Sequence, residues 1–237
     1  MFLASLLATF ITTQAYGNSC SGNNLSFYGN AIVNGDAESS TYLSTSGGFR
    51  SYAPTNWCSV RGNMVVENYA DASAPNISPT SPGPSDRGNL VFEGGGSGTA
   101  TITQTLSLIS ISSEISSGQV YFTLSGWLGG YTGQDDSDTF TVTFMDAGSN
   151  VLSAVTIGPV LDVDRGGVSE LLYRSANGYI PTAATSAVFN LTATRYVGFN
   201  NGYADNLSFV AQVPEPGSML MMGSGLVGIG ALRRRRA

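Results

Sequence analysis

Residues 119–128, Gln-Val-Tyr-Phe-Thr-Leu-Ser-Gly-Trp-Leu, place apolar side chains at alternate positions. A period of two is the pattern of a β-strand that buries one face. β-branched or aromatic residues alternate in the same way in other segments, at residues 90–92, 100–108, 139–145, 151–157, 169–173, 187–193 and 206–210. The sequence therefore predicts a chain built mainly of short strands.

The segments around this region support the same fold class. Short apolar stretches at residues 30–33 and 64–68 add two strands, and only residues 111–117 have the composition of a helical turn. Residues 72–87 are rich in proline, serine and asparagine, which predicts an irregular surface loop too polar to hold a core. About ten strands without an amphipathic helix favour an all-β fold, an antiparallel β-sandwich and most simply a jelly roll.

Composition limits the possible partners. The 237 residues include no histidine, and 16 acidic residues outnumber 10 basic ones, giving a formal net charge of −6. Four of the basic residues are arginines at the C-terminus, so the rest of the chain is strongly acidic. Nucleic acid is excluded as a partner because its phosphates require a basic surface. An acidic surface suits an extracellular protein or one that holds calcium.

The N-terminus has the pattern of an export signal. Residues 2–11 are apolar and Ala15 supplies a small residue for cleavage, so residues 1–15 are predicted to be a secretory signal peptide. No lysine or arginine precedes the apolar run, and a buried N-terminal helix is the alternative. The body of the protein would then be one β-sandwich domain at residues 16–212.

The C-terminus has three parts in fixed order. They are a Val-Pro-Glu-Pro-Gly motif, an uncharged apolar run at residues 218–232 and a block of arginines. The two prolines favour an extended, accessible peptide. The fifteen-residue run is shorter than the roughly 20 residues of a relaxed transmembrane helix. Arginines beside a membrane span stay in the cytoplasm, so the body would lie on the opposite side. The motif is Val213, Pro214, Glu215, Pro216 and Gly217, and the arginines are Arg233, Arg234, Arg235 and Arg236.

These three parts at residues 213–237 resemble the PEP-CTERM sorting signal of Gram-negative bacteria. The resemblance implies that exosortase, a membrane-embedded enzyme similar to cysteine transpeptidases, recognises the signal and cuts near Pro-Glu-Pro. It also implies a precursor tethered to the inner membrane, followed by transfer to the cell surface or the extracellular matrix. An ordinary membrane anchor after a proline-rich linker is the alternative.

Two further segments resemble the paired ends of galactose-binding-like domains, the jelly rolls of many carbohydrate-binding modules. They are residues 31–38, Ala-Ile-Val-Asn-Gly-Asp-Ala-Glu, and residues 202–207, Gly-Tyr-Ala-Asp-Asn-Leu. The resemblance implies that the first and last strands lie side by side and hold a structural calcium ion. Glu38 and Asp205 would be its ligands, with Asp36 as a further candidate, because calcium prefers oxygen donors. A turn with a solvated glutamate and an aspartate that caps the last strand is the alternative.

The two cysteines and two acidic turns complete the candidate structural features. Cys20 and Cys58 lie in the exported body, where an even pair predicts a disulfide. Lipidation of Cys20 is a weaker alternative, since Gly-Asn-Ser precedes it. Residues 135–138 are predicted to form a solvated hairpin tip, with adventitious cation binding as the alternative, and residues 162–167 a turn.

The residue types favour a non-enzymatic protein. Without histidine the chain lacks Ser-His-Asp and Cys-His catalysis and the usual zinc hydrolase sites, and no glycine-rich phosphate loop is present. The first hypothesis is an exported surface or matrix protein. The second is a carbohydrate-binding module for exopolysaccharide, whose aromatic residues Trp57, Trp127 or Tyr131 would stack on sugar rings. Alternation along residues 124–131 predicts that Trp127 packs in the core instead.

Overall fold

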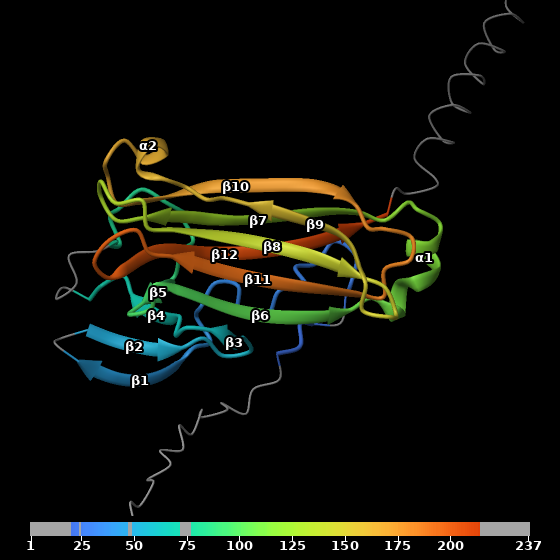
Figure 1. Cartoon of the computed structure of the whole chain (residues 1–237), viewed down its shortest axis with the longest axis horizontal. Helices are drawn as coiled ribbons and strands as arrows, with labels where there is room; N and C mark the ends of the chain where they lie inside the picture. Colours follow the sequence, from blue (N-terminus) through green and yellow to red (C-terminus); the bar gives the residue numbers. More distant parts are fainter. Residues whose placement is uncertain (1–19, 24, 47–48, 72–76, 214–237) are drawn as a thin grey trace, which may run out of the picture.

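The computed structural model describes residues 20–23, 25–46, 49–71 and 77–213 (Figure 1). The predicted signal peptide lies outside the described residues, as does the sorting segment from Pro214 onward with its four arginines. The described chain forms two β-sheets that stack face to face, with three short helical segments at their ends (Figure 1).

Every strand pair is antiparallel, and strands from distant parts of the sequence are neighbours. The seven-stranded sheet contains, in spatial order, β1 (Thr41–Ser46), β2 (Phe49–Ala53), β4 (Val65–Asn68), β5 (Leu90–Gly95), β12 (Asn200–Gln212), β7 (Tyr121–Gly130) and β10 (Glu170–Tyr179). The five-stranded sheet contains β3 (Cys58–Arg61), β6 (Thr99–Ser107), β11 (Ser186–Thr194), β8 (Ser137–Met145) and β9 (Val151–Ile157). The helical segments are η1 (Ile109–Ile111), α1 (Ser112–Ser116) and α2 (Asp162–Arg165).

The last eight strands have the topology of a jelly roll. In spatial order they lie as β5-β12-β7-β10 in one sheet and β6-β11-β8-β9 in the other. β12 lies between β5 and β7, and β11 lies between β6 and β8, as in the two Greek keys of a jelly roll. The predicted all-β antiparallel sandwich with jelly-roll topology is therefore confirmed.

The core lies between the sheets and is rich in phenylalanine. On β7, Phe122, Leu124 and Leu128 face inward, whereas the residues between them point to the outer face of the sheet. Phe122 packs against Phe144 and Phe209 with ring centroids 5.1 and 5.4 Å apart. The hydrophobic burial of these alternating side chains is the main stabilising term of such a sandwich.

The predicted solvated tip at residues 135–138 is wrong, because Asp136 and Asp138 are fully buried. The Asp136 carboxylate accepts hydrogen bonds from the backbone N–H groups of Tyr196 and Val197 in the β11–β12 connection and of Asn201 in β12. Asp138 points into the sandwich beside Gly202, and burial raises the pKa of its carboxyl to about 8, with the nearby Asp136 adding to the shift. These acids are structural groups at one end of the sandwich.

Other differences from the sequence predictions are local. The sequence did not predict β1, β2 or β3. The described side chains of β1, Thr41 to Leu43, are all exposed, and β3 has no buried side chain, so neither strand has a buried face that alternation could reveal. Residues 162–167, predicted as a turn, begin with the short helix α2, and residues 30–33 form an isolated bridge at Asn30 in place of a strand.

Cys20 and Cys58 form a disulfide, with their Cα atoms 5.3 Å apart. The pairing agrees with the sequence prediction. Cys58 opens β3, which pairs with β6 at the edge of the five-stranded sheet. The bond therefore ties the start of the described chain to that edge.

The N-terminal segment lies beside the last strand, as the resemblance implied. β5 pairs with only the first part of β12, and residues 28–35 take its place alongside the remainder. The N–H of Ala31 donates to the carbonyl of Phe209, and the N–H of Leu207 donates to the carbonyl of Gly35 at 2.8 Å. A Cβ on Gly35 would lie 2.2 Å from the Leu207 carbonyl oxygen, so this close approach requires glycine.

Candidate functional site

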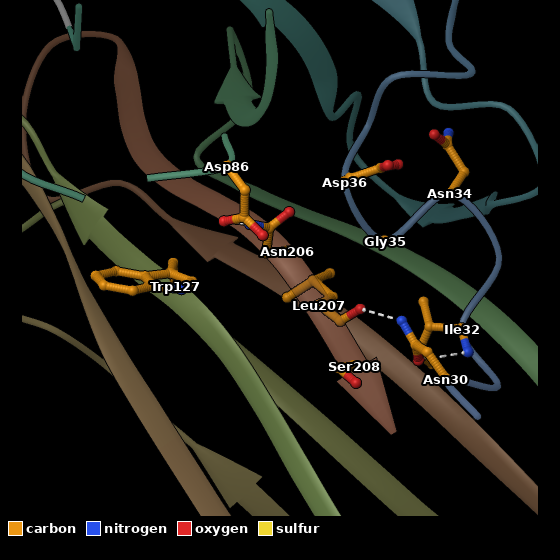
Figure 2. Close-up of a pocket in the computed structure, with 10 residues that line it drawn as sticks. All are labelled: Asn30, Ile32, Asn34, Gly35, Asp36, Asp86, Trp127, Asn206, Leu207 and Ser208. Carbon is orange, nitrogen blue, oxygen red and sulfur yellow. Dashed lines mark hydrogen bonds between the residues drawn. The ribbon is translucent and has the colours of Figure 1, made fainter. Parts of the chain in front are cut away.

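A pocket of about 400 Å³ opens where the N-terminal segment, β12 and β7 meet (Figure 2). Its floor is β12 at Asn206, Leu207 and Ser208. Trp127 lies on one side and the N-terminal loop on the other, as Figure 2 shows. The pocket is lined by Asn30, Ile32, Asn34, Gly35, Asp36, Asp86, Trp127, Asn206, Leu207 and Ser208. Its lining thus combines one large aromatic ring with several amide and carboxylate groups.

A β-bulge in β12 forms the floor. The register with β7 shifts between Asp205 and Ser208, and Asn206 adopts a φ of 49°. Asparagine tolerates this left-handed conformation better than most residues. Its side-chain Nδ2 donates a hydrogen bond to Asp86 Oδ1 at 3.0 Å (Figure 2). The bulge therefore brings the Asn206 side chain against Asp86, which comes from a distant loop.

The loop that carries Asp86 is held in place by Arg87. Its guanidinium donates to the carbonyl oxygens of Pro84, Ser78 and Ser81 and lies 5.1 Å from the ring centroid of Tyr69. A guanidinium that satisfies three carbonyls fixes an otherwise irregular loop. Arg87 is thus a positioning residue for the pocket wall.

This loop covers a second, smaller hydrophobic cluster on the outer face of the seven-stranded sheet. The cluster contains Tyr69, Ile77, Val91, Leu171 and Tyr203, all buried. The prediction that residues 72–87 are too polar to hold a core is wrong for their described part, because Ile77 is buried with 5% of its surface exposed.

The three aromatic candidates lie in different places. Trp57 is 4% exposed, packs edge to face on Phe92 and Phe140, and donates its indole N–H to the Asn34 carbonyl at 3.2 Å. This burial contradicts its prediction as a stacking residue. Tyr131 is half-buried against the smaller cluster and does not line the pocket.

Trp127 is the aromatic residue that the pocket does contain. It is half-buried on the outer face of β7, and its ring centroid lies 5.7 Å from that of Tyr173 on β10. Its predicted place in the core is therefore wrong, because the inner face of β7 belongs to Phe122, Leu124 and Leu128.

The three predicted calcium ligands lie near the same junction, in different environments. Asp205 is buried and accepts a hydrogen bond from the Tyr69 hydroxyl at 2.7 Å. Burial raises the pKa of its carboxyl to about 8, and the negative charges of Asp36 and Glu38 add to the shift. Asp36 is exposed on the pocket rim.

Glu38 is occupied by backbone contacts. Its Oε1 accepts hydrogen bonds from the N–H groups of Asn89 and Leu90 at 2.7 and 2.6 Å. Within the described residues, no three acidic or cysteine side chains form a group that could hold a metal ion. The three carboxylates thus do not form a closed coordination shell, and calcium binding stays a prediction.

Sequence reasoning missed Asp86 and Asn206 as pocket residues. Asp86 lies in a loop that the sequence marks only as polar, and Asn206 lies in a bulge that the alternation of β12 does not reveal. The positive φ of an asparagine beside a strand is a structural signal that the sequence alone does not carry.

The last strand leads directly into the C-terminal motif. β12 ends at Gln212, and the carbonyl of Val213 accepts a hydrogen bond from the Tyr28 hydroxyl at 2.7 Å. The PEP-CTERM protein-sorting motif matches residues 212–236. The chain carries a PEP-CTERM sorting motif. Its first two residues belong to the folded domain, and the motif indicates an exported protein that exosortase processes for sorting to the cell surface.

Several solved structures are similar in fold to this chain at low sequence identity. A tailspike protein 4 active domain of bacteriophage CBA120 has a TM-score of 0.44 at 16% identity, covering 77% of this chain but only 21% of the tailspike. A family 16 carbohydrate-binding module has a TM-score of 0.44 at 16% identity over 76% of this chain and 99% of the module. TmCBM61, solved with β-1,4-galactotriose, has a TM-score of 0.41 at 12% identity over 78% and 99%. No curated protein matches the chain in sequence.

None of the helices in the described ranges is long and apolar enough to span a membrane.

Proposed function

We propose that this protein is a non-enzymatic surface module that binds a neutral polysaccharide through the Trp127 pocket. The observation that carries the proposal is the lining of the pocket, where a half-buried indole lies beside the side chains of Asp86, Asn206 and Ser208 (Figure 2). Sugar rings offer C–H faces to an aromatic ring and hydroxyl groups to amides and carboxylates. A pocket of about 400 Å³ is large enough for a small ligand.

Binding is favoured over catalysis by the residues available. The chain has no histidine, which removes the commonest general base and most zinc hydrolase sites. In the pocket the Asp86 carboxylate accepts a hydrogen bond from Asn206, an arrangement suited to orienting hydroxyl groups. Display on the cell surface or in the extracellular matrix would place this pocket next to secreted polysaccharide.

Retention on immobilised polysaccharides tests the binding proposal. The full chain is passed over a panel of neutral bacterial and plant polysaccharides, together with Asp86→Ala, Trp127→Ala and the control Tyr196→Ala. Tyr196 is 75% exposed in the β11–β12 connection, away from the pocket. Retention that is lost in the two pocket variants and kept in Tyr196→Ala supports the proposal, and absence of retention on the whole panel contradicts it.

We further propose that the precursor is tethered in the inner membrane of a Gram-negative bacterium by residues 218–232 and is cut by exosortase C-terminal to Val213. The support is the hydrogen bond from the Tyr28 hydroxyl to the Val213 carbonyl, which makes Val213 part of the folded domain. Intact mass of the protein from membrane and medium, compared with a variant carrying alanines at Pro214, Glu215 and Pro216, tests this. A wild-type product that keeps its terminal arginines would contradict processing.

A further inference from the structure

The outer face of β12, β7 and β10 is ordered into four rows by the register of these strands. Each row contains one residue from each strand, read from the pocket end. The rows are Asp205-Trp127-Tyr173, Ser208-Ser125-Ser175, Val210-Thr123-Asn177 and Gln212-Tyr121-Tyr179. Aromatic residues occupy the two end rows, and small polar residues dominate the two rows between them.

Both aromatic pairs have the same geometry. Trp127 and Tyr173 lie edge to face with centroids 5.7 Å apart, and Tyr121 and Tyr179 do so at 5.4 Å. Tyr173 is 50% exposed and Tyr179 is 62% exposed. The pairs are six residues apart along β7, which corresponds to about 20 Å of strand. This separation is longer than a single sugar ring and requires an extended ligand to reach both pairs.

The chemistry between the pairs favours a carbohydrate over a protein partner. The middle rows offer the hydroxyls of Ser125, Ser175 and Thr123 and the amide of Asn177. Protein interfaces usually have a continuous apolar centre, whereas here the aromatic rings lie at the two ends and Val210 is the one apolar side chain of the middle rows. Alternating aromatic and hydrogen-bonding positions instead match a polymer with both C–H faces and hydroxyl groups.

The charge of the face restricts the polymer further. The four rows contain no arginine, and their one acid, Asp205, accepts a hydrogen bond from Tyr69. Arg174 lies on β10 but at an alternate position, where it forms an ion pair with Asp164 at 3.7 Å. A polyanion would find no counter-charge in these rows, so the ligand is a neutral chain.

We propose that this face is a binding surface for an extended, neutral polysaccharide chain that runs along β7 and β10 from Trp127 to Tyr121. The proposal rests on the proposed function, because the Trp127 pocket forms one end of the path. β10 is the edge strand of its sheet, so no further strand bounds the path on that side, whereas beyond Trp127 the next row, with Leu171 and Tyr203, is buried under the loop that carries Asp86. The ligand class is thus a linear glycan several sugar units long.

A chain-length series tests this surface. The probe is the neutral polysaccharide fraction of the producing bacterium's culture medium, intact and hydrolysed to sized oligosaccharides from disaccharide to octasaccharide. Calorimetry with the full chain should show roughly tenfold tighter binding of the octasaccharide than of the disaccharide, the scale expected when a second aromatic anchor engages. Tyr179→Ala should remove this gain, and Tyr179→Phe and Tyr196→Ala should keep it.

The outcomes separate the two proposals. Length-independent binding that Asp86→Ala abolishes and Tyr179→Ala leaves unchanged would overturn the extended surface while keeping the pocket. Absence of binding to every fraction would overturn the proposed function, and the extended surface with it. Because the Tyr179 side chain is mostly exposed, its removal leaves the fold intact, which the thermal midpoint of each variant verifies.

Discussion

The outer faces of the two sheets differ in composition although the same alternation builds both. The five-stranded sheet presents rows such as Thr101-Thr192-Thr139, and its hydroxyls bond to each other, at 3.1 Å between Thr101 and Thr192. The seven-stranded sheet presents two aromatic pairs and a covered cluster. Threonine satisfies strand propensity and its own hydrogen bonds, whereas exposed aromatic rings gain little from folding. The difference is the one expected if the seven-stranded face binds the polysaccharide that we propose.

Removing the disulfide should have the largest effect on stability, because the bond anchors the N-terminal segment to the five-stranded sheet. Replacing Cys20 and Cys58 by serine should lower the free energy of unfolding by about 3–4 kcal/mol, since the bond closes a sequence separation of 38 residues. Urea unfolding of the oxidised wild type and the double variant measures the difference. Equal midpoints would show that the bond does not constrain the unfolded chain.

The buried acids at the end of the sandwich should make stability depend on pH. Because burial raises the folded-state pKa of Asp138 from 3.8 to about 8, the carboxyl is neutral in the folded protein. Its stabilising contribution is complete below about pH 4 and is lost as the pH rises toward 8, by of order 1 kcal/mol per pH unit.

Asp138→Asn tests this assignment, since the amide keeps the shape and cannot ionise. Unfolding free energies measured from pH 5 to pH 8 should fall less steeply in the variant than in the wild type. Parallel slopes would assign the pH dependence to other groups, of which Glu93 is the first candidate because burial and the neighbouring Glu67 raise its pKa as well.

A substitution at Gly35 should disturb the contact between the N-terminal segment and β12 of the seven-stranded sheet. Gly35→Ala places a Cβ against the Leu207 carbonyl oxygen and should cost about 2 kcal/mol of stability. It should also weaken polysaccharide binding, because the same contact shapes the pocket. Gly96→Ala is the matched control, since nothing lies within 4 Å of its added Cβ. Equal stability of the two variants would show that the first and last segments are not in tight contact.

The alternation of side chains predicted most of the sandwich but not the site. β6, β7, β8, β11 and the second half of β12 bury every second side chain, so their existence follows from the sequence. The sequence does not show which face of β7 points into the core, because Phe122 and Tyr121, on opposite faces, are both aromatic. The buried role of Asp136 depends on amides 60 or more residues away. Pairing between segments far apart in the sequence thus determines which residues meet at the site, and the local pattern of side chains does not reveal them.

Calcium should have a smaller effect on stability, through the carboxylates beside β12 of the seven-stranded sheet. If Asp36, Glu38 and Asp205 hold the ion, calcium at about five times its Kd should add about 1 kcal/mol to the free energy of unfolding. Thermal unfolding with calcium and with a chelator measures this, and Asp205→Asn should remove the response. Identical midpoints in both buffers would contradict the calcium prediction.

The smallest effect on stability should come from a substitution on the threonine-rich outer face of the five-stranded sheet. This substitution also tests most directly which of the two outer faces binds the ligand. Thr141→Val removes a hydroxyl that is 2.8 Å from that of Thr156 and keeps the side-chain shape, so stability should change by less than about 0.5 kcal/mol. Tyr179→Ala should be equally mild for stability, because its ring is mostly exposed. The two variants should differ in binding alone, with polysaccharide retention unchanged in Thr141→Val and weakened in Tyr179→Ala. Loss of retention in the threonine variant would assign the ligand to the opposite sheet, because neither substitution disturbs the core that joins the two faces.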